Sequence, residues 1–180
     1  GGLNIQDWDN RMELLSTISF PKVTTANNIV LLELNSLTSL DFSSLETAES
    51  IGFYYSNNLN SISFPSLNYS RYLYFQENNN LNEISLPNLE MVGNGNLNYG
   101  SHFIVSNNQS LSSLLIPSLT KVFGGLEIRY NNNFNVSSIN NCDFFVYNTN
   151  GYKCDFGEVN INGNANNTYC FQDLSLIHIS

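Results

Sequence analysis

A nine-residue phrase recurs along the chain at a nearly constant interval, and this repeat restricts the fold more strongly than any other feature. The clearest copy is "LNSISFPSL" at residues 59–67, and related phrases begin at Leu15, Leu37, Leu81 and Leu111, with a degraded copy at Phe134. Successive copies start about 22 residues apart, and only the interval from Leu81 to Leu111 is clearly longer. A period in the twenties is typical of a solenoid, in which each repeat forms one coil of a stack.

The same columns are apolar in the five phrases that begin with Leu. Three, five and eight residues after this Leu stands Ile, Leu, Val or Phe, and an apolar pair spaced by two residues precedes the later phrases. A spacing of two residues indicates short strands with one buried face. One coil buries only about six such side chains, at about 1.5–3 kcal/mol each, whereas ordering its backbone costs about 1–2 kcal/mol per residue. Coils must therefore stack, and we predict an all-β fold, a right-handed parallel β-solenoid with coils of about 22 residues.

The repeat sets the limits of the predicted domain. Residues 1–141 form the predicted solenoid of about six coils, and because they begin inside a repeat at "GGLNI", we expect a fragment that lacks its N-terminus. Residues 174–180, "LSLIHIS", break the repeat and resemble the translated end of a sequencing adapter. We treat this segment as a scar and set its His178 aside, with a genuine terminal strand as the alternative.

The segment between these two, residues 142–173, keeps no repeat phase. Solenoids need an atypical terminal unit over the open end of the core, and we predict that this segment is that cap. It holds the three cysteines of the chain, of which Cys142 and Cys154 could staple it, while Cys170 is left without a partner.

Asparagine is unusually frequent, at 32 of 180 residues, and part of this excess falls in one column of the repeat. Two positions before the start of a phrase stands an amide in every copy but the first, which has Glu13. Stacked amide side chains can hydrogen-bond along a ladder in parallel sheets, and amides at turns also cap backbone groups. We therefore interpret this column as a structural ladder rather than a ligand site; it comprises Asn35, Asn57, Asn79, Gln109 and Asn132.

Charge and hydropathy argue against two classes of partner. The chain carries a net charge of −9, and its six basic residues are scattered singly. Phosphate binding needs clustered Lys and Arg, so we predict no nucleic-acid partner. No apolar run is long enough to cross a bilayer, so any attachment to a membrane would require an anchor outside this chain.

The chain has few residues of the types that catalysis requires. His102 is the only histidine outside the C-terminal segment, which leaves His-based triads and metal sites almost without members. Carboxylate pairs for glycoside hydrolysis occupy different, outward columns of the repeat, so we interpret them as solvated surface. We therefore predict that the chain is not an enzyme and holds no metal or cofactor. The carboxylates considered are Asp41, Glu46, Glu83 and Glu90.

Two groups of residues could serve recognition. Aromatic side chains occupy outward positions of the predicted strands, and exposed Tyr is a frequent contact for proteins and glycans; cross-strand stabilisation is the alternative. The extra residues of the one longer interval, around 93–102, could form a binding edge or be a neutral insertion. The candidate recognition residues are Tyr54, Tyr72, Tyr74, Tyr99, His102, Arg129 and Tyr130.

Asn-x-Ser/Thr triplets mark where the chain would be N-glycosylated if it is secreted. With 32 Asn, chance alone would supply about as many triplets as occur, so their number does not argue for secretion. The four triplets begin at Asn68, Asn108, Asn135 and Asn166.

The combination "FPSLNYS…LYFQENNNLNEISLPNLEMVG" resembles receptor L-domains, the leucine-rich-repeat-like solenoids of cell-surface proteins. It is most similar to fungal GPI-anchored cell-wall organisation proteins of the sporulation-specific type, whose coils read "L-x-S-I-x-F-P-x-L-x-x-V-G-G-x-L-x-I-x-x-N". The closing "NCDFFVYNTNGYKC" is similar to the Cys-containing end of that family, which implies a Cys142–Cys154 disulfide. Bacterial surface leucine-rich repeats, with "L-x-x-I-x-I-P", are a second candidate. In this chain the "V-G-G-x-L-x-I" part of the fungal motif, at the junction of two coils, is approximated by Val122, Gly124, Gly125, Leu126 and Ile128, with Phe123 inserted.

This resemblance implies leucine-rich-repeat-like coils in a secreted, glycosylated, non-catalytic protein of the cell surface or cell wall. Such a protein would contribute to cell-wall organisation or adhesion, with wall polysaccharide or surface proteins as partners and a GPI lipid anchor outside this chain. The alternatives are the ligand-binding ectodomain of a surface receptor, with a protein or glycan ligand, and a bacterial-type leucine-rich-repeat surface protein. A wall-active glycosidase is a third class.

Overall fold

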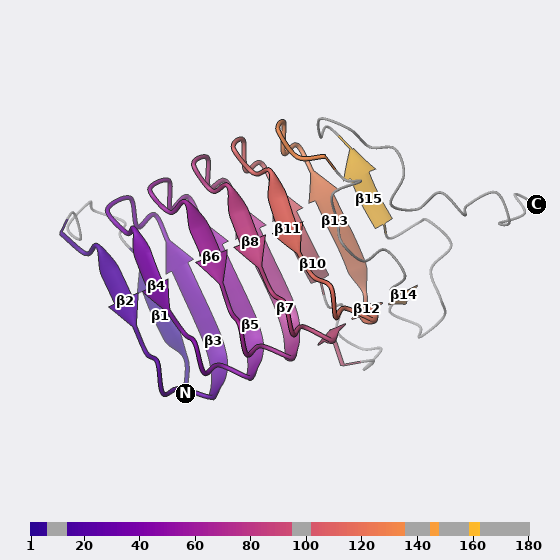
Figure 1. Ribbon diagram of the computed structural model, residues 1–180, viewed down its shortest axis with the longest axis horizontal. Coiled ribbons are helices and arrows are strands. Elements are labelled where there is room, and N and C mark those ends of the chain that lie inside the picture. The colour runs from indigo at the N-terminus through magenta and orange to yellow at the C-terminus, as the bar shows by residue number, and fades with distance from the viewer. Residues whose placement is uncertain (7–13, 95–101, 136–144, 148–158, 163–180) are drawn as a thin grey trace, which may run out of the picture.

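Fifteen strands and no helix make up the described part of the computed structural model, which covers residues 1–6, 14–94, 102–135, 145–147 and 159–162. Successive coils stack side by side along the long axis of the molecule, and every strand pair is parallel (Figure 1). The structure therefore confirms the predicted all-β parallel solenoid with coils of about 22 residues.

The longer strands form one continuous sheet, called here the long-strand sheet. Its order is β1-β3-β5-β7-β10-β13-β15, and β9, β12 and β14 pair along its margin. Pairing joins Ile29 to Ile51 and Ile51 to Leu73, so each step across the sheet is one repeat of the sequence. The strands are β1 (Leu3–Gln6), β3 (Thr25–Leu32), β5 (Thr47–Tyr54), β7 (Tyr69–Gln76), β9 (Met91–Val92), β10 (His102–Ser106), β12 (Lys121–Phe123), β13 (Gly125–Arg129), β14 (Phe145–Tyr147) and β15 (Val159–Asn162).

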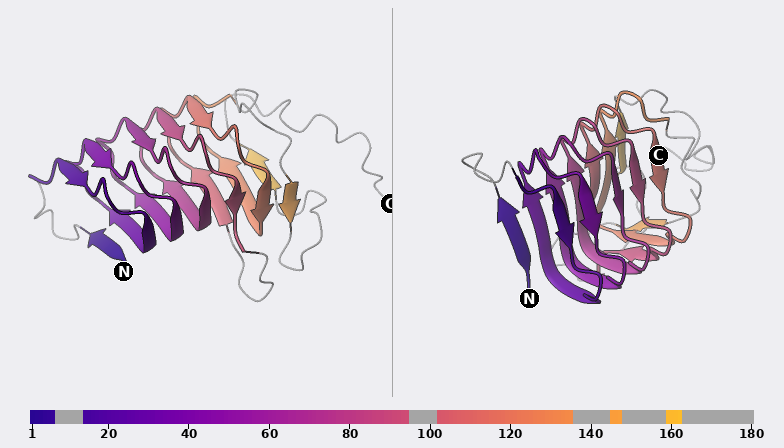
Figure 2. Two further views of the ribbon diagram at one scale, coloured as in Figure 1. Left: turned by 60° about the horizontal axis from the view of Figure 1, so that its bottom comes forward. Right: turned by 60° about the vertical axis from the view of Figure 1, so that its left-hand side comes forward.

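Shorter strands form the opposite side of each coil (Figure 2). They pair in two groups, β2-β4 and β6-β8-β11, again in register from coil to coil, as at Ile62↔Ile84. A turn follows each of these strands, and its first residue accepts a hydrogen bond from the N–H group three residues on. In the turn after β6, Leu67 N–H donates to Phe64 O at 3.3 Å, and Pro65 occupies the second position. The strands are β2 (Thr17–Ser19), β4 (Ser39–Asp41), β6 (Ser61–Ser63), β8 (Glu83–Ser85) and β11 (Ser113–Leu115).

The apolar columns of the repeat fill the space between the two sides. Phe53 stacks on Phe75 in the next coil, with centroids 5.9 Å apart, and meets Phe64 of the short-strand side edge-on at 6.1 Å. All three side chains are fully buried. Phe20 in the first phrase differs, because it packs on Phe42 at 5.7 Å yet remains 41% exposed. Burial of the phrase residues thus depends on having neighbouring coils, as expected for a stack.

Two amide columns run along the turn after the long strands, not one. The predicted column is on the surface, where Asn79 N–H bonds Asn57 Oδ1 at 2.8 Å and Asn57 Nδ2 bonds Asn35 Oδ1 at 3.4 Å. Further along this column, Asn132 Nδ2 bonds Gln109 Oε1.

The second column lies one residue earlier, is fully buried, and was missed in the sequence. Its members are Ser56, Asn78, Asn108 and Asn131. Backbone N–H groups of Ser56, Asn78 and Asn108 each donate to the amide oxygen of the next member at 3.0 Å. Each Asn also donates Nδ2 to a strand carbonyl in the preceding coil, at 2.9–3.0 Å. These side chains therefore satisfy buried backbone groups that would otherwise lack partners.

This buried column corrects one predicted glycosylation site. Asn108 begins a sequon, but its side chain is fully buried, and Nδ2, the atom that would carry a glycan, donates to Phe75 O at 2.9 Å and to Asn131 Oδ1 at 3.2 Å. Asn108 is therefore a structural residue of the folded chain, whereas Asn68 and Asn135 are exposed. Several other sequence predictions lie outside the described residues; they concern Glu13, Asn166, His178 and the cysteines Cys142, Cys154 and Cys170.

A left-handed residue precedes each member of the inner column. Five non-glycine residues of the described chain have φ between 55° and 60°. This conformation turns the chain out of the long-strand sheet toward the short-strand side, and it is unfavourable for most L-residues. Tyr55, Glu77, Asn107 and Tyr130 precede the four members of the inner column, and the fifth residue, Glu33, precedes the buried Leu34 in the equivalent turn.

Candidate recognition surface

Side chains that alternate with the core residues of the long strands form the outer face of the long-strand sheet. Because the strands pair in register, outward residues from successive coils lie side by side. The three candidate tyrosines of β5 and β7 consequently share one region of one face. Across β3, β5 and β7 the rows are Asn28–Ser50–Tyr72, Val30–Gly52–Tyr74 and Leu32–Tyr54–Gln76.

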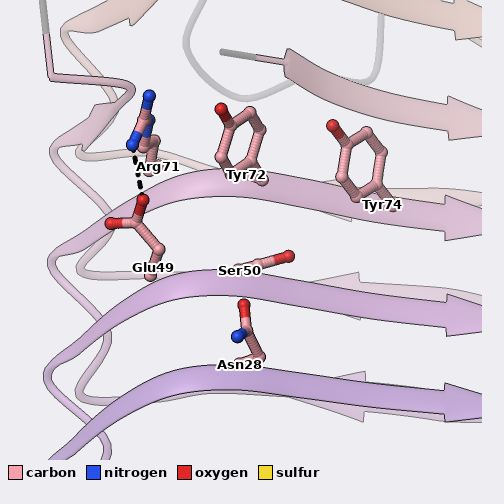
Figure 3. Close-up of a pocket in the computed structure, with 6 residues that line it drawn as sticks. All are labelled: Asn28, Glu49, Ser50, Arg71, Tyr72 and Tyr74. Atoms are coloured by element: carbon pink, nitrogen blue, oxygen red, sulfur yellow. Dashed lines mark hydrogen bonds and ion pairs between the residues drawn. The ribbon is translucent and has the colours of Figure 1, made fainter. Parts of the chain in front are cut away.

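Tyr54, Tyr72 and Tyr74, called here the tyrosine cluster, pack against one another on this face. The ring centroids of Tyr72 and Tyr74 are 6.1 Å apart with 13° between the ring planes, and those of Tyr54 and Tyr74 are 6.3 Å apart at 30°. Figure 3 shows the rings of Tyr72 and Tyr74 side by side along β7, with their hydroxyl groups pointing the same way. Each of the three residues is half-buried, so part of its surface packs on the sheet and part stays accessible.

Gly52 provides the space in which the ring of Tyr54 lies. A Cβ atom built at position 52 would come within 2.6 Å of Tyr54 Cε2 and 3.1 Å of the Tyr54 hydroxyl oxygen, so the ring lies across the glycine. Gly52 pairs in register with Tyr74, which brings the ring of Tyr54 beside that of Tyr74. Aromatic rings that cover a glycine on a sheet compensate for the packing that the glycine lacks.

An ion pair borders the tyrosine cluster. Arg71 Nη1 lies 2.6 Å from Glu49 Oε1, and the Arg71 guanidinium carbon lies 5.0 Å from the centroid of the Tyr72 ring. The hydrogen bond from Arg71 to Glu49 raises the pKa of Arg71 above its ordinary value. The guanidinium is therefore charged at any physiological pH, and its charge is offset by the carboxylate beside it.

A shallow, open depression of about 430 Å³ lies beside the rings (Figure 3). An enclosed pocket would surround most of a small ligand, whereas this depression leaves one side of any ligand in solvent. Its lining combines aromatic surface with an amide, a hydroxyl and the ion pair, through Asn28, Glu49, Ser50, Arg71, Tyr72 and Tyr74.

Burial raises the pKa of two phenols of the cluster, those of Tyr54 and Tyr74. It raises the pKa of Tyr54 to about 12, with a further contribution from Tyr74 beside it. Burial also raises the pKa of Tyr74, and the neighbouring Tyr72 adds to that shift. At neutral pH these hydroxyl groups are uncharged and can both donate and accept hydrogen bonds.

An insertion lengthens the repeat between Leu81 and Leu111. The strands on either side of it, β9 and β10, both pair with β7, which supplies Arg71 and Tyr72 to the depression. β9 ends opposite Ser70, and β10 begins opposite Tyr72. The two ends of the insertion are therefore next to Arg71, the residue of β7 between these two. Gly93, with φ of 86°, donates its N–H to Ser70 O at 2.9 Å as the chain leaves the sheet. Tyr99 of the insertion lies outside the described residues.

The other candidate recognition residues fall in two places. His102 is the first residue of β10 and is therefore next to the tyrosine cluster in register. Arg129 ends β13 in the same row as Tyr54 but three strands further along the sheet, or about 14 Å away at the usual strand spacing. There it pairs with Glu127 at 3.0 Å and lies 5.8 Å from the ring of Tyr130, a side chain that is 48% exposed. Arg129 and Tyr130 thus form a second, separate site.

The carboxylates considered for glycoside hydrolysis are spread over different elements. Asp41 on β4 and Glu83 on β8 belong to the short-strand side, whereas Glu46 and Glu90 precede long strands two coils apart. Hydrogen bonding from Ser43 lowers the pKa of Asp41. Within the described ranges, no three His, Cys, Asp or Glu side chains gather closely enough to hold a metal ion. The described part of the chain also contains no helix of the length and hydropathy needed to cross a membrane.

Sequence reasoning found the three tyrosines of the site but not the residues around them. Gly52 and Ser50 were missed although their small side chains interrupt an outward column of larger residues, and this interruption is the signal that could have identified them. The partnership of Arg71 with Glu49 was visible as two opposite charges one repeat apart. Comparison with protein-family models, with curated proteins and with solved structures found no match to this chain.

Proposed function

We propose that this chain is a non-catalytic recognition module of a cell-surface or cell-wall protein that contributes to cell-wall organisation or adhesion. The observation that carries the proposal is the tyrosine cluster, three half-exposed rings held by register on one face of a continuous sheet. Tyrosine is a favoured contact residue because its rigid ring buries a large area and loses little conformational freedom. The expected partners are cell-wall polysaccharide or surface proteins, and no cofactor is needed.

The placement of the acidic residues supports a role without catalysis. A glycosidase needs two carboxyl groups on either side of one bond, about 5–9.5 Å apart. Asp41 and Glu83 lie on the short-strand side, away from the tyrosine cluster, and Glu49 beside the cluster is paired with Arg71. A surface that holds a ligand by stacking and hydrogen bonding requires none of these groups to transfer a proton.

The proposed location is extracellular, at the cell surface or wall, with a lipid anchor outside this chain. The resemblance to receptor L-domains supports this location, and exposed Asn68 and Asn135 are the described sequons that could accept a glycan. Expression through a secretory pathway tests it. A mass shift removed by N-glycosidase and abolished by Asn68→Gln with Asn135→Gln is expected, and an unmodified, retained product would contradict it.

Binding to intact surfaces tests the function itself. Purified chain should co-sediment with isolated cell walls and bind to whole cells, and heat-unfolded chain serves as the control. The same mixtures should release no reducing sugar. Absence of binding to walls and to cells would overturn the proposal, and so would sugar release that is lost on Glu83→Gln or Asp41→Asn.

A receptor ectodomain is the second candidate, supported by the insertion that opens beside Arg71. Binding loops placed on a rigid scaffold are typical of receptors. The complete gene product separates the two candidates. Release from cells by a phospholipase that cleaves lipid anchors supports a wall or surface organiser, whereas retention through a membrane-spanning segment supports a receptor.

A further inference from the structure

We propose that the tyrosine cluster and the adjoining depression bind an internal stretch of a neutral, extended polysaccharide. This inference rests on the proposed function and specifies its ligand. The occupant is a glycan chain rather than a protein, an ion or a free monosaccharide, and four properties of the surface lead to this assignment.

The first property is the arrangement of the rings. Tyr72 and Tyr74 are almost parallel, at 13°, and lie side by side along one strand with centroids 6.1 Å apart. That spacing is comparable to one sugar unit of an extended chain, so successive sugar units can contact the accessible edges and hydroxyl groups of successive tyrosines. Tyr54 extends the surface onto β5, because it lies across Gly52 beside Tyr74. Three adjacent rings favour a ligand with repeated flat apolar faces.

The second property is the polar border. Asn28 and Ser50 line the depression in the row of Tyr72, and burial raises the pKa of the Tyr54 and Tyr74 phenols, so both are protonated at neutral pH. Amide and hydroxyl groups can each donate and accept, as the hydroxyl groups of a sugar also do. Apolar ring faces bordered by such groups match the two kinds of surface that a carbohydrate presents.

The third property is the local charge. The depression has one cation and one anion in its lining, and they bond to each other through Arg71 Nη1 and Glu49 Oε1 at 2.6 Å. An acidic polysaccharide would have to compete with Glu49 for Arg71, and a basic ligand would have to compete with Arg71 for Glu49. Charge complementarity therefore favours a ligand without charge.

The fourth property is openness. The depression is shallow and open to solvent, and its lining residues come from three neighbouring strands, β3, β5 and β7. A site for a chain end or a monosaccharide is closed on at least one side, because small ligands need to be largely enclosed. A shallow surface that is open to solvent allows a polymer to lie across it. Affinity for one short segment is then modest, and binding of long chains is strengthened by several contacts at once.

Titration calorimetry of the full chain with defined oligosaccharides tests the proposal. The probes are cellohexaose, laminarihexaose and chitohexaose as neutral ligands and hexagalacturonate as the charged comparison. We expect at least one neutral hexasaccharide to bind and hexagalacturonate to bind more weakly. Absence of binding by all three neutral hexasaccharides, or a preference for hexagalacturonate, would overturn the assignment.

Variants locate the binding. Tyr72→Ala and Tyr74→Ala should each weaken the affinity about tenfold, as loss of a central aromatic contact does. Phe20→Ala, which removes a partly exposed ring on the short-strand side of the solenoid, should change it less than about twofold. Tyr72→Gln and Tyr74→Gln are alternatives should either Ala variant fold poorly, as judged by circular dichroism. Equal affinity of wild type and the Tyr72 and Tyr74 variants would overturn the proposal.

Gly52→Ala is the positioning test, because it displaces the ring of Tyr54 and removes no contact group. It should weaken hexasaccharide binding about threefold to tenfold. It should also return the Tyr54 phenol toward an ordinary pKa, a spectroscopic change that a general loss of stability would not produce.

These outcomes are distinct from failure of the proposed function. Wall binding that persists unchanged in Tyr72→Ala and Tyr74→Ala would retain the recognition role and reject this site. Binding of a hexasaccharide by a chain that binds neither walls nor cells would retain the site and reject the role. Wall binding abolished by protease treatment of the walls would identify a protein partner and overturn the assignment to a glycan.

Discussion

The ring of Tyr54 lies across Gly52, so closely that a side chain at position 52 would come within 2.6 Å of the ring. Gly52→Ala should therefore force the ring off the sheet and away from Tyr74, with a loss of about 1 kcal/mol in the free energy of unfolding. In a Tyr54→Ala background the same substitution should stabilise the chain by about 0.5–1 kcal/mol, because a glycine within a strand is entropically unfavourable.

Urea denaturation of the four proteins in this double-mutant cycle measures the coupling. The effect of Gly52→Ala on the free energy of unfolding should have opposite signs in the wild-type and Tyr54→Ala backgrounds. If Gly52→Ala has the same effect with and without the Tyr54 ring, the contact contributes nothing to stability.

The inner amide column should matter far more than the outer one, although the two are adjacent in the chain. Asn78→Ala removes the acceptor for Ser56 N–H and the donor to Phe53 O, both buried, and should cost about 2–4 kcal/mol. Asn79→Ala removes an exposed side chain and should cost less than about 0.5 kcal/mol. Chemical denaturation of the two single variants gives the comparison. Equal losses would mean that the outer column is as structural as the inner one.

Left-handed turn residues store strain that an asparagine relieves. Glu77 and Asn107 occupy equivalent turns with φ of 59° and 56°, and Asn tolerates this conformation better than Glu. Glu77→Asn should stabilise the chain by about 0.5 kcal/mol, and Asn107→Glu should destabilise it by a similar amount. Thermal and urea unfolding of this reciprocal pair provides the check. A gain from both substitutions would point to surface charge rather than backbone conformation.

Ionisation of Tyr54 should make stability fall at alkaline pH. Burial raises the pKa of Tyr54 to about 12 from 10.0, so the folded chain holds this proton more tightly than the unfolded chain. The contribution of Tyr54 is therefore complete below about pH 10 and is lost as the pH rises toward 12. Absorbance titration at alkaline pH should show a late-ionising component that is missing in Tyr54→Phe. A single transition near pH 10 in both proteins would contradict the buried environment.

Much of the fold was predictable because the repeat specifies it many times over. Columns such as Ile62, Phe64 and Leu67 recur in phase, and a nearly fixed period combined with strand spacing is compatible with few arrangements other than stacked coils. The outward position of Tyr72 and Tyr74 was predictable for the same reason, since residues alternate across a strand. Both inferences need only local spacing.

The turns were harder, because local spacing no longer decides which side chain points inward. At "NNN", residues 78–80, three identical side chains follow a left-handed residue, and only the first enters the core. The repeat pattern had indicated the second, Asn79, which does bond along the surface column, but it had missed the buried first. The sequon at Asn108 failed for the same reason, since a triplet of residue types says nothing about the burial of its first member.

Residue pattern alone was therefore enough to establish a parallel solenoid, its core columns and an aromatic outer face, because each depends on periodicity repeated in every coil. The inner amide column, the covering of Gly52 by Tyr54 and the bonding of Arg71 to Glu49, which the sequence shows only as opposite charges one repeat apart, were established by three-dimensional packing. Each joins residues through the register between neighbouring coils, or through a ring folded back on its own strand. Such contacts depend on distances across the sheet, which the order of residues along one coil does not contain.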